Sequence, residues 1–134
     1  MKPLTLFIIP SHKREPKHLK RCAESFGNVV HEVRVVDKPA QFDKLFAATP
    51  WIGFVYSSEE LDDLVRDRLE DTYLVQSMWA WLSLFSESND GKYYQQPRFF
   101  KSDIPLQPGA PYPINIEEFE GTMILDGMLR EQSD

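Results

Sequence analysis

The stretch LTLFIIP, residues 4–10, decides the fold of this chain. Six apolar or β-branched residues follow one another without alternation, and a proline ends the run. An unbroken run of this kind is typical of a strand that is buried on both faces, as in the middle of a parallel sheet. We therefore predict that residues 4–9 form a central parallel strand.

A helix is predicted directly after this strand. Pro16 is suited to the first helical turn, and Ser11 is a residue type that caps helices. Apolar residues then recur at helical spacing until Gly27 and Asn28, namely Leu19, Cys22, Ala23 and Phe26. We expect a helix with one apolar face, capped by Ser11 and ended by the glycine.

Two further strands complete the predicted core. Residues 31–37 carry three valines and end before Lys38 and Pro39, and residues 51–56 read WIGFVY. Strand, helix and strand within so short a span are typical of a βαβ unit with a right-handed crossover. The first, second and third strands are therefore expected to be parallel neighbours in one sheet.

The rest of the chain has weaker signals. Residues 57–60 read SSEE, a capping-box pattern in which the Ser57 hydroxyl meets the amide of Glu60 and the Glu60 carboxylate reaches back. It predicts a helix with a buried face of Leu61, Leu64, Val65 and Leu69, continued in a second helical stretch by Leu74, Met78, Trp81, Leu82 and Phe85. Residues 93–100 are expected to form a strand, and residues 121–129 a short strand or helix. Scattered prolines make residues 92–134 an irregular C-terminal part.

Composition limits the classes of function. A length of 134 residues fits one domain, residues 1–134, and the net charge of −6 argues against non-specific nucleic-acid binding. The lone cysteine, Cys22, excludes a disulfide within the chain and a cysteine-based zinc site. No apolar run approaches the roughly 20 residues that cross a bilayer, so we expect no membrane span and a cytoplasmic location.

Three segments in this order resemble the GT-A glycosyltransferases, the nucleotide-diphospho-sugar transferases. They are residues 8–15, IIPSHKRE, with the following Leu19, Cys22 and Ser25; residues 33–37, which end in Val-Asp; and residues 51–55, WIGFV. The resemblance covers about residues 4–65 and implies a reduced, Rossmann-like α/β fold with a single open, mostly parallel sheet flanked by helices. Residues 4–65 would then be the nucleotide-binding half.

The resemblance also implies a nucleotide site beyond the carboxyl ends of the strands, where ligands of open parallel sheets bind. The residues at the matching positions are Pro10, Ser11, His12, Arg14, Asp37 and Lys44. Each has a plainer alternative: Ser11 as a helix cap, Asp37 as a strand-ending turn, and the basic residues as a solvated helix face.

This sequence departs most from the GT-A pattern at the position of the family's metal site. GT-A enzymes carry Asp-x-Asp after the third strand, where paired carboxylates hold Mn²⁺ or Mg²⁺, but the matching residues are Tyr56, Ser57 and Ser58. Glu59 is the remaining candidate metal ligand, although an acid at a helix N-terminus explains it equally. The other solution is that Lys13, Arg14 and Lys44 neutralise a diphosphate without metal.

The function implied by the resemblance is transfer of a hexose from a nucleotide-diphospho-sugar to an unknown acceptor. An inverting transferase needs a general base, and the candidates are five carboxylates without a distinguishing pattern, Asp103, Glu117, Glu118, Glu120 and Asp126, with Glu118 and Asp126 preferred. So short a chain would need a small acceptor, a homo-oligomer or a protein partner. The alternative is a non-catalytic binding or protein-interaction module derived from the GT-A fold.

Overall fold

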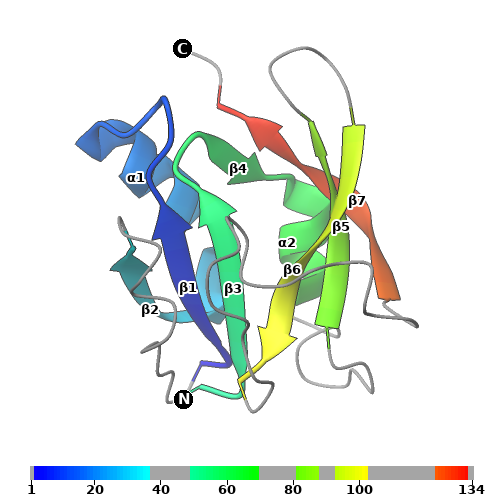
Figure 1. Cartoon of the computed structure of the whole chain (residues 1–134). Helices are drawn as coiled ribbons and strands as arrows, with labels where there is room; N and C mark the ends of the chain where they lie inside the picture. Colours follow the sequence, from blue (N-terminus) through cyan, green and yellow to red (C-terminus); the bar gives the residue numbers. More distant parts are fainter. Residues whose placement is uncertain (1, 37–48, 70–80, 88–92, 103–122, 133–134) are drawn as a thin grey trace.

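The computed structural model describes residues 2–36, 49–69, 81–87, 93–102 and 123–132. The described elements are mostly strands, with short helices between the first and second strands and between the fourth and fifth (Figure 1). The strands are β1 (Leu4–Ile9), β2 (Val30–Val35), β3 (Trp51–Tyr56), β4 (Glu59–Leu61), β5 (Trp81–Glu87), β6 (Tyr93–Lys101) and β7 (Met123–Glu131). The helices are α1 (Pro16–Glu24), the 3-10 turn η1 (Gly27–Val29) and α2 (Asp63–Arg68).

The unit predicted from residues 4–56 is present. β1 lies between β2 and β3 and is parallel to both, with Leu6 opposite Val33 on one side and Gly53 on the other. Leu6 faces the core shared with α1, whereas Phe7 stacks on Phe54 at 5.3 Å between ring centroids. Both residues are fully buried, which explains why the β1 sequence is apolar without alternation.

Helix α1 begins at Pro16 as predicted, but its cap differs. Glu15 is the N-cap residue and forms a reciprocal capping box with His18, while Ser11 lies farther back in the loop and does not cap the helix. The helix buries Cys22, and Phe26 follows it into the core before Gly27 turns the chain with a φ of 68°. A positive φ is easily adopted by glycine, which accounts for the end of the helix.

The helix predicted from the SSEE pattern begins later than expected. Residues Glu59–Leu61 form β4, which pairs antiparallel with β7, and α2 follows with Asp62 as its N-cap, accepting from the Leu64 amide at 2.8 Å. The Ser57 hydroxyl and the Glu60 carboxylate therefore do not form the predicted capping box. Pairing with a distant strand takes these residues out of the helix.

The second predicted helical stretch is also wrong for its final part. Trp81–Glu87 is strand β5, which pairs antiparallel with β6 and parallel with β7. A short apolar run fits helix and strand equally, and the strand partners lie far along the chain. Leu74 and Met78 lie outside the described residues. The strand predicted at residues 93–100 is confirmed by β6. Of the two forms expected within residues 121–129, the strand is confirmed by β7, which begins at Met123.

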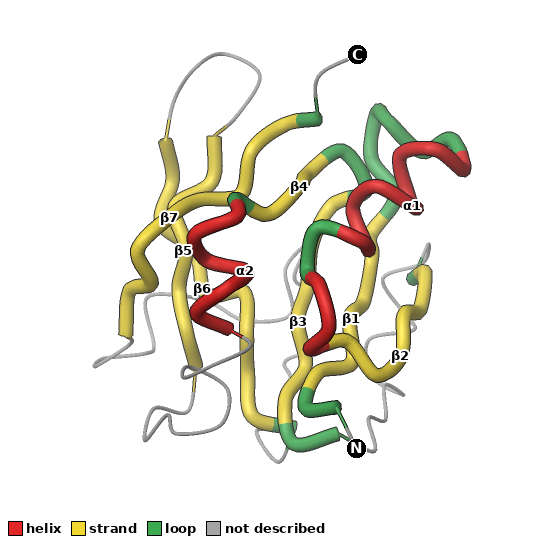
Figure 2. Tube along the Cα trace, turned by 180° about the vertical axis from the view of Figure 1, so that it is seen from behind, coloured by secondary structure: helices red, strands yellow, loops and turns green. Residues whose placement is uncertain are grey.

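The described strands form one seven-stranded sheet in the order β2-β1-β3-β6-β5-β7-β4. The α/β class is confirmed, but the sheet is mixed, because β6 runs antiparallel to β3 and β5, and β4 antiparallel to β7. Seen from behind, α1 and α2 lie on the same face of the sheet (Figure 2). The core cluster beneath them joins Leu6 and Val55 of the first strands to Phe99 and Leu129 near the C-terminus.

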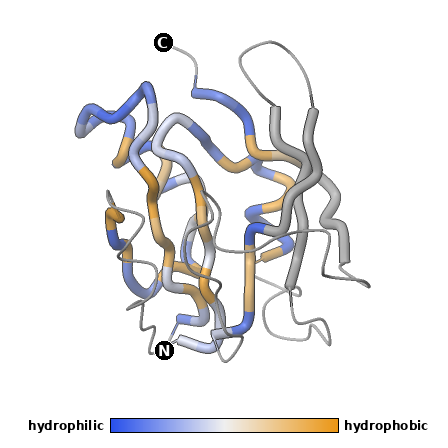
Figure 3. The backbone as a smooth tube through the Cα atoms, viewed as in Figure 1, coloured by the Kyte–Doolittle hydropathy of each residue, from blue (hydrophilic) through white to orange (hydrophobic). Residues whose placement is uncertain are grey.

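The hydropathy of the residues differs between the strands of this core and the loops at one end of the sheet (Figure 3). Apolar residues run along β1 and β3, whereas the loop after β1 and the end of β7 are hydrophilic and lie at the same end of the sheet. Among the described helices, none combines the length and the apolar character that crossing a bilayer requires. The polar end is where the sequence places the candidate site.

Candidate functional site

The loop after β1 and the turn after β3 meet at the carboxyl ends of these strands. The Ser11 amide donates to Ser57 Oγ at 2.9 Å, and the Ser58 amide donates to Ser11 Oγ at 3.2 Å. Ser57 Oγ donates in turn to the Lys13 carbonyl at 2.6 Å. Ser11 and Ser57 therefore hold the loop against the turn where GT-A enzymes carry their paired acids. Both serines were predicted to cap helices, and neither does so.

Gln132, for which no sequence pattern predicts a role, fastens the end of β7 to the same turn. It is buried, and its amide donates to the Ser58 carbonyl at 2.8 Å. Its Nε2 lies within hydrogen-bonding distance of the carbonyls of Ser57 (2.9 Å), Glu59 (3.2 Å) and His18 (2.8 Å). One amide side chain thus joins the β3 turn, β4 and α1. A glutamine near the end of a chain gives no local signal of such a role.

The basic residues of the loop have different surroundings. Lys13 Nζ donates to the Gln132 carbonyl and lies 3.7 Å from the Glu131 carboxylate, which also contacts His12 Nε2. Arg14 is exposed, and its Nε donates to the Ser11 carbonyl at 2.8 Å. The loop therefore presents three cationic or ionisable side chains around one short polar turn.

The other predicted nucleotide and catalytic residues are only partly placed. Pro10 is half-buried at the start of the loop. Asp37, Lys44 and Glu118 lie outside the described residues, as do three further carboxylates considered as bases, Asp103, Glu117 and Glu120. Asp126 lies on β7, of which the backbone alone is described at that position. Their roles stay predictions.

Glu59, the candidate metal ligand, is buried against Arg98 of β6. Its two carboxylate oxygens accept from Arg98 Nη1 at 2.8 Å and Nη2 at 3.0 Å, and Oε1 also accepts from the Tyr56 amide at 2.8 Å. Arg98 Nη1 reaches the Phe54 carbonyl at 3.3 Å, and the guanidinium lies 5.5 Å from the centroid of the Tyr56 ring. In this arrangement the Arg98 guanidinium occupies both oxygens of the carboxylate that could otherwise bind a metal ion.

The described residues contain no group of three His, Cys, Asp or Glu side chains close enough together to hold a metal ion. Tyr56, Ser57 and Ser58 offer hydroxyl groups in place of the two carboxylates of the GT-A pattern. Neutral hydroxyls are weak ligands for hard divalent cations. These hydroxyls can donate and accept hydrogen bonds at this turn.

Burial controls the ionisation of two groups beside the Glu59–Arg98 pair. It raises the pKa of the Cys22 thiol from 9.0 to about 12, and the nearby Glu59 carboxylate acts in the same direction. Burial also raises the pKa of the Tyr56 hydroxyl, although Arg98 opposes it. Because the thiolate is the nucleophilic form of cysteine, Cys22 belongs to the core and not to a reactive centre.

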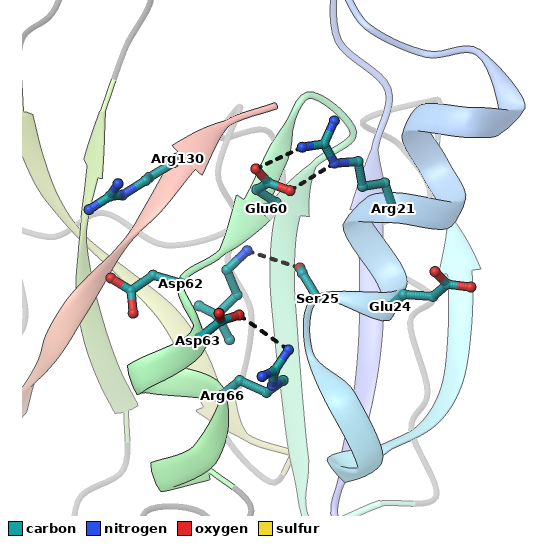
Figure 4. Close-up of a pocket in the computed structure, with 9 residues that line it drawn as sticks. Arg21, Glu24, Ser25, Glu60, Asp62, Asp63, Arg66 and Arg130 are labelled. Carbon is teal, nitrogen blue, oxygen red and sulfur yellow. Dashed lines mark hydrogen bonds and ion pairs between the residues drawn. The ribbon is translucent and has the colours of Figure 1, made fainter. Parts of the chain in front are cut away.

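A cleft of about 560 Å³ lies away from the predicted site, between the helices and β4 (Figure 4). Arg21 of α1 and Glu60 of β4 point toward each other there, with Arg21 Nε 2.9 Å from Glu60 Oε2. Arg21 is therefore the partner of the Glu60 carboxylate, for which the sequence predicted a capping box. Asp63 and Arg66 of α2 form a second pair at 3.3 Å. Side chains of both signs therefore line this cleft.

A scan of the sequence against models of known protein families gives no match. A search of curated proteins finds no similar sequence either.

Proposed function

We propose that this protein binds a nucleoside diphosphate, free or as its sugar conjugate, through the loop after β1, and that it does so without a divalent cation. The observation that carries the proposal is the contact between Ser11 and Ser57, which brings the loop and the turn of the GT-A pattern together at the carboxyl ends of parallel strands. Ligands of open α/β sheets bind at this edge.

The charge of the loop supports an anionic ligand. Lys13 and Arg14 follow the Ser11 turn in a protein whose net charge is −6, so this local excess of cations opposes the overall balance. Guanidinium and ammonium groups form charge-assisted hydrogen bonds with phosphate oxygens. The exposed Arg14 is the side chain that we expect to contribute most directly.

The surroundings of Glu59 support independence from metal. A cation at Glu59 would have to compete with the two hydrogen bonds from Arg98 inside the protein. Transfer of the sugar would need, in addition, a base such as Glu118 or Asp126. We therefore place nucleotide binding first and hexosyl transfer second.

Calorimetric titration with uridine and guanosine diphosphates tests the proposal. Replacing Arg14 with alanine should weaken binding by roughly 1.5 to 3 kcal/mol, the range for a hydrogen bond to a charged group. Arg66→Ala is the matched control, because it removes the same charge from α2, outside the loop after β1. Equal losses in the two variants would contradict a specific role for Arg14.

A second candidate is the non-catalytic interaction module. It is favoured by one specific observation, the hydrogen bonds of Gln132 with the loop and the turn. Its Nε2 donates to the Ser57 carbonyl and its carbonyl accepts from Lys13 Nζ, so these groups already have partners inside the protein. Absence of nucleotide binding to the wild-type protein would favour this candidate over the first.

A further inference from the structure

The end of β7 places a carboxylate on two basic groups of the candidate loop. The Glu131 carboxylate contacts His12 Nε2 and lies 3.7 Å from Lys13 Nζ. The side chains are 25% exposed for Glu131, 18% for Lys13 and 49% for His12, so the contact is at the surface. A ligand could reach it without opening the core.

An oxygen anion held between an imidazole and an ammonium group has the chemistry of a bound phosphate. Both groups donate to carboxylate and to phosphate oxygens, and the hydrogen bonds are strengthened by charge in each case. The Glu131 carboxylate therefore accepts the same hydrogen bonds that a bound phosphate group would accept.

The backbone and the side chain of this segment are held differently. Gln132 is buried and fixes the strand end through the Ser58 carbonyl, and Glu131 itself pairs with Glu59 in the β4–β7 register. The Glu131 carboxylate, in contrast, is partly exposed and can turn to solvent by a change of rotamer. Displacement of the carboxylate then requires no movement of the strand.

We propose that His12 and Lys13 form a phosphate-binding site and that Glu131 is its internal competitor, which an anionic ligand must displace. This inference rests on the proposed function, because the phosphate is that of the nucleoside diphosphate. It adds that the affinity of the free protein is lowered by its own carboxylate. Removing the charge of Glu131 should therefore strengthen binding.

The test compares Glu131→Gln with Glu32→Gln, using uridine diphosphate and inorganic pyrophosphate as calorimetric probes. Glu32 is the matched control, because it is also a partly exposed partner in an ion pair, with Arg34, but lies on β2. Both variants change the net charge by the same amount. We expect Glu131→Gln to bind both probes about threefold to tenfold more tightly than the wild type and Glu32→Gln to differ by less than twofold.

A third variant separates competition at Lys13 from a general loosening of the loop. Adding Lys13→Met to Glu131→Gln should reduce the gain in affinity, since one of the two groups that the carboxylate releases is then absent. If Glu131→Gln binds no better than Glu32→Gln while the wild type still binds nucleotide, the competitor role is wrong and the proposed function stands. If no variant binds either probe, both are wrong.

Discussion

Glu59 and Arg98 form a two-point ion pair inside the protein, with Oε1 to Nη1 at 2.8 Å and Oε2 to Nη2 at 3.0 Å. The pair joins the start of β4 to β6, across 39 residues of sequence. It also limits what the turn after β3 can do, because both carboxylate oxygens of Glu59 already accept hydrogen bonds from Arg98.

Replacing Glu59 with glutamine should destabilise the fold by about 3 to 5 kcal/mol, because the buried Arg98 charge loses its partner. The double variant Glu59→Leu with Arg98→Met should recover much of this loss, since no uncompensated charge is left in the interior. Urea unfolding gives both free energies. A double variant that is as unstable as the sum of the two single changes, Glu59→Leu and Arg98→Met, would show that the residues do not act as a pair.

Gln132→Ala should lower the free energy of unfolding by about 1 to 3 kcal/mol. The change removes hydrogen bonds to the backbone carbonyls of Ser57, Glu59 and His18, the first two of which are buried. The exposed neighbour Arg130 provides a control, and its alanine variant should stay within about 0.5 kcal/mol of the wild type. Equal effects in a urea titration would contradict the fastening role of Gln132.

Stability should fall with alkaline pH because of Cys22. The thiol ionises near pH 9.0 when unfolded, whereas its pKa is about 12 in the fold, so the stabilisation is complete below pH 9 and is lost as the pH rises toward 12. Between pH 8 and 10 the wild type should lose about 1.4 kcal/mol more than Cys22→Ala. Urea unfolding at the two pH values measures the difference. Parallel losses would mean that the thiol is not shielded in the fold.

Gly53 of β3 leaves room for the ring of Phe99. A Cβ atom at Gly53 would lie 3.2 Å from Phe99 Cδ1, and that ring also packs edge-on against Phe26, at 6.1 Å between centroids. Because Phe99 is fully buried and cannot yield easily, Gly53→Ala should destabilise by about 1 to 3 kcal/mol. Thermal unfolding checks this. Adding Phe99→Leu should cost less in Gly53→Ala than in the wild type, and strict additivity would contradict the steric cause.

The first part of the fold was predictable because its signals are local. The apolar run of residues 4–9, Pro16 at the start of α1 and the valines of β2 each act within a few residues of themselves. Parallel pairing of β1 with β2 and β3 then follows from the size of the βαβ unit. Of the candidate site, the same reasoning brought the loop after β1 toward the turn after β3.

The remaining features depend on partners that are distant in sequence. The SSEE pattern has the local features of a helix start. In the fold, however, Glu59 is bound by the buried Arg98 and Glu60 pairs with Arg21, and a strand forms there instead. Strand β5 likewise depends on β6 and β7. Gln132 and Glu131 have no periodic pattern at all, and their contacts with the loop could be found only once β7 was placed.

Binding of a nucleoside diphosphate without metal is tested most directly by the dissociation constant measured with Mn²⁺ and again with a chelator. With Glu59 held by Arg98 and hydroxyls at Tyr56 and Ser58, we expect the two values to agree within about threefold, with measurable binding in both. A loss of more than tenfold on chelation, equivalent to about 1.4 kcal/mol, would contradict the account and make Glu59 or another carboxylate a metal ligand.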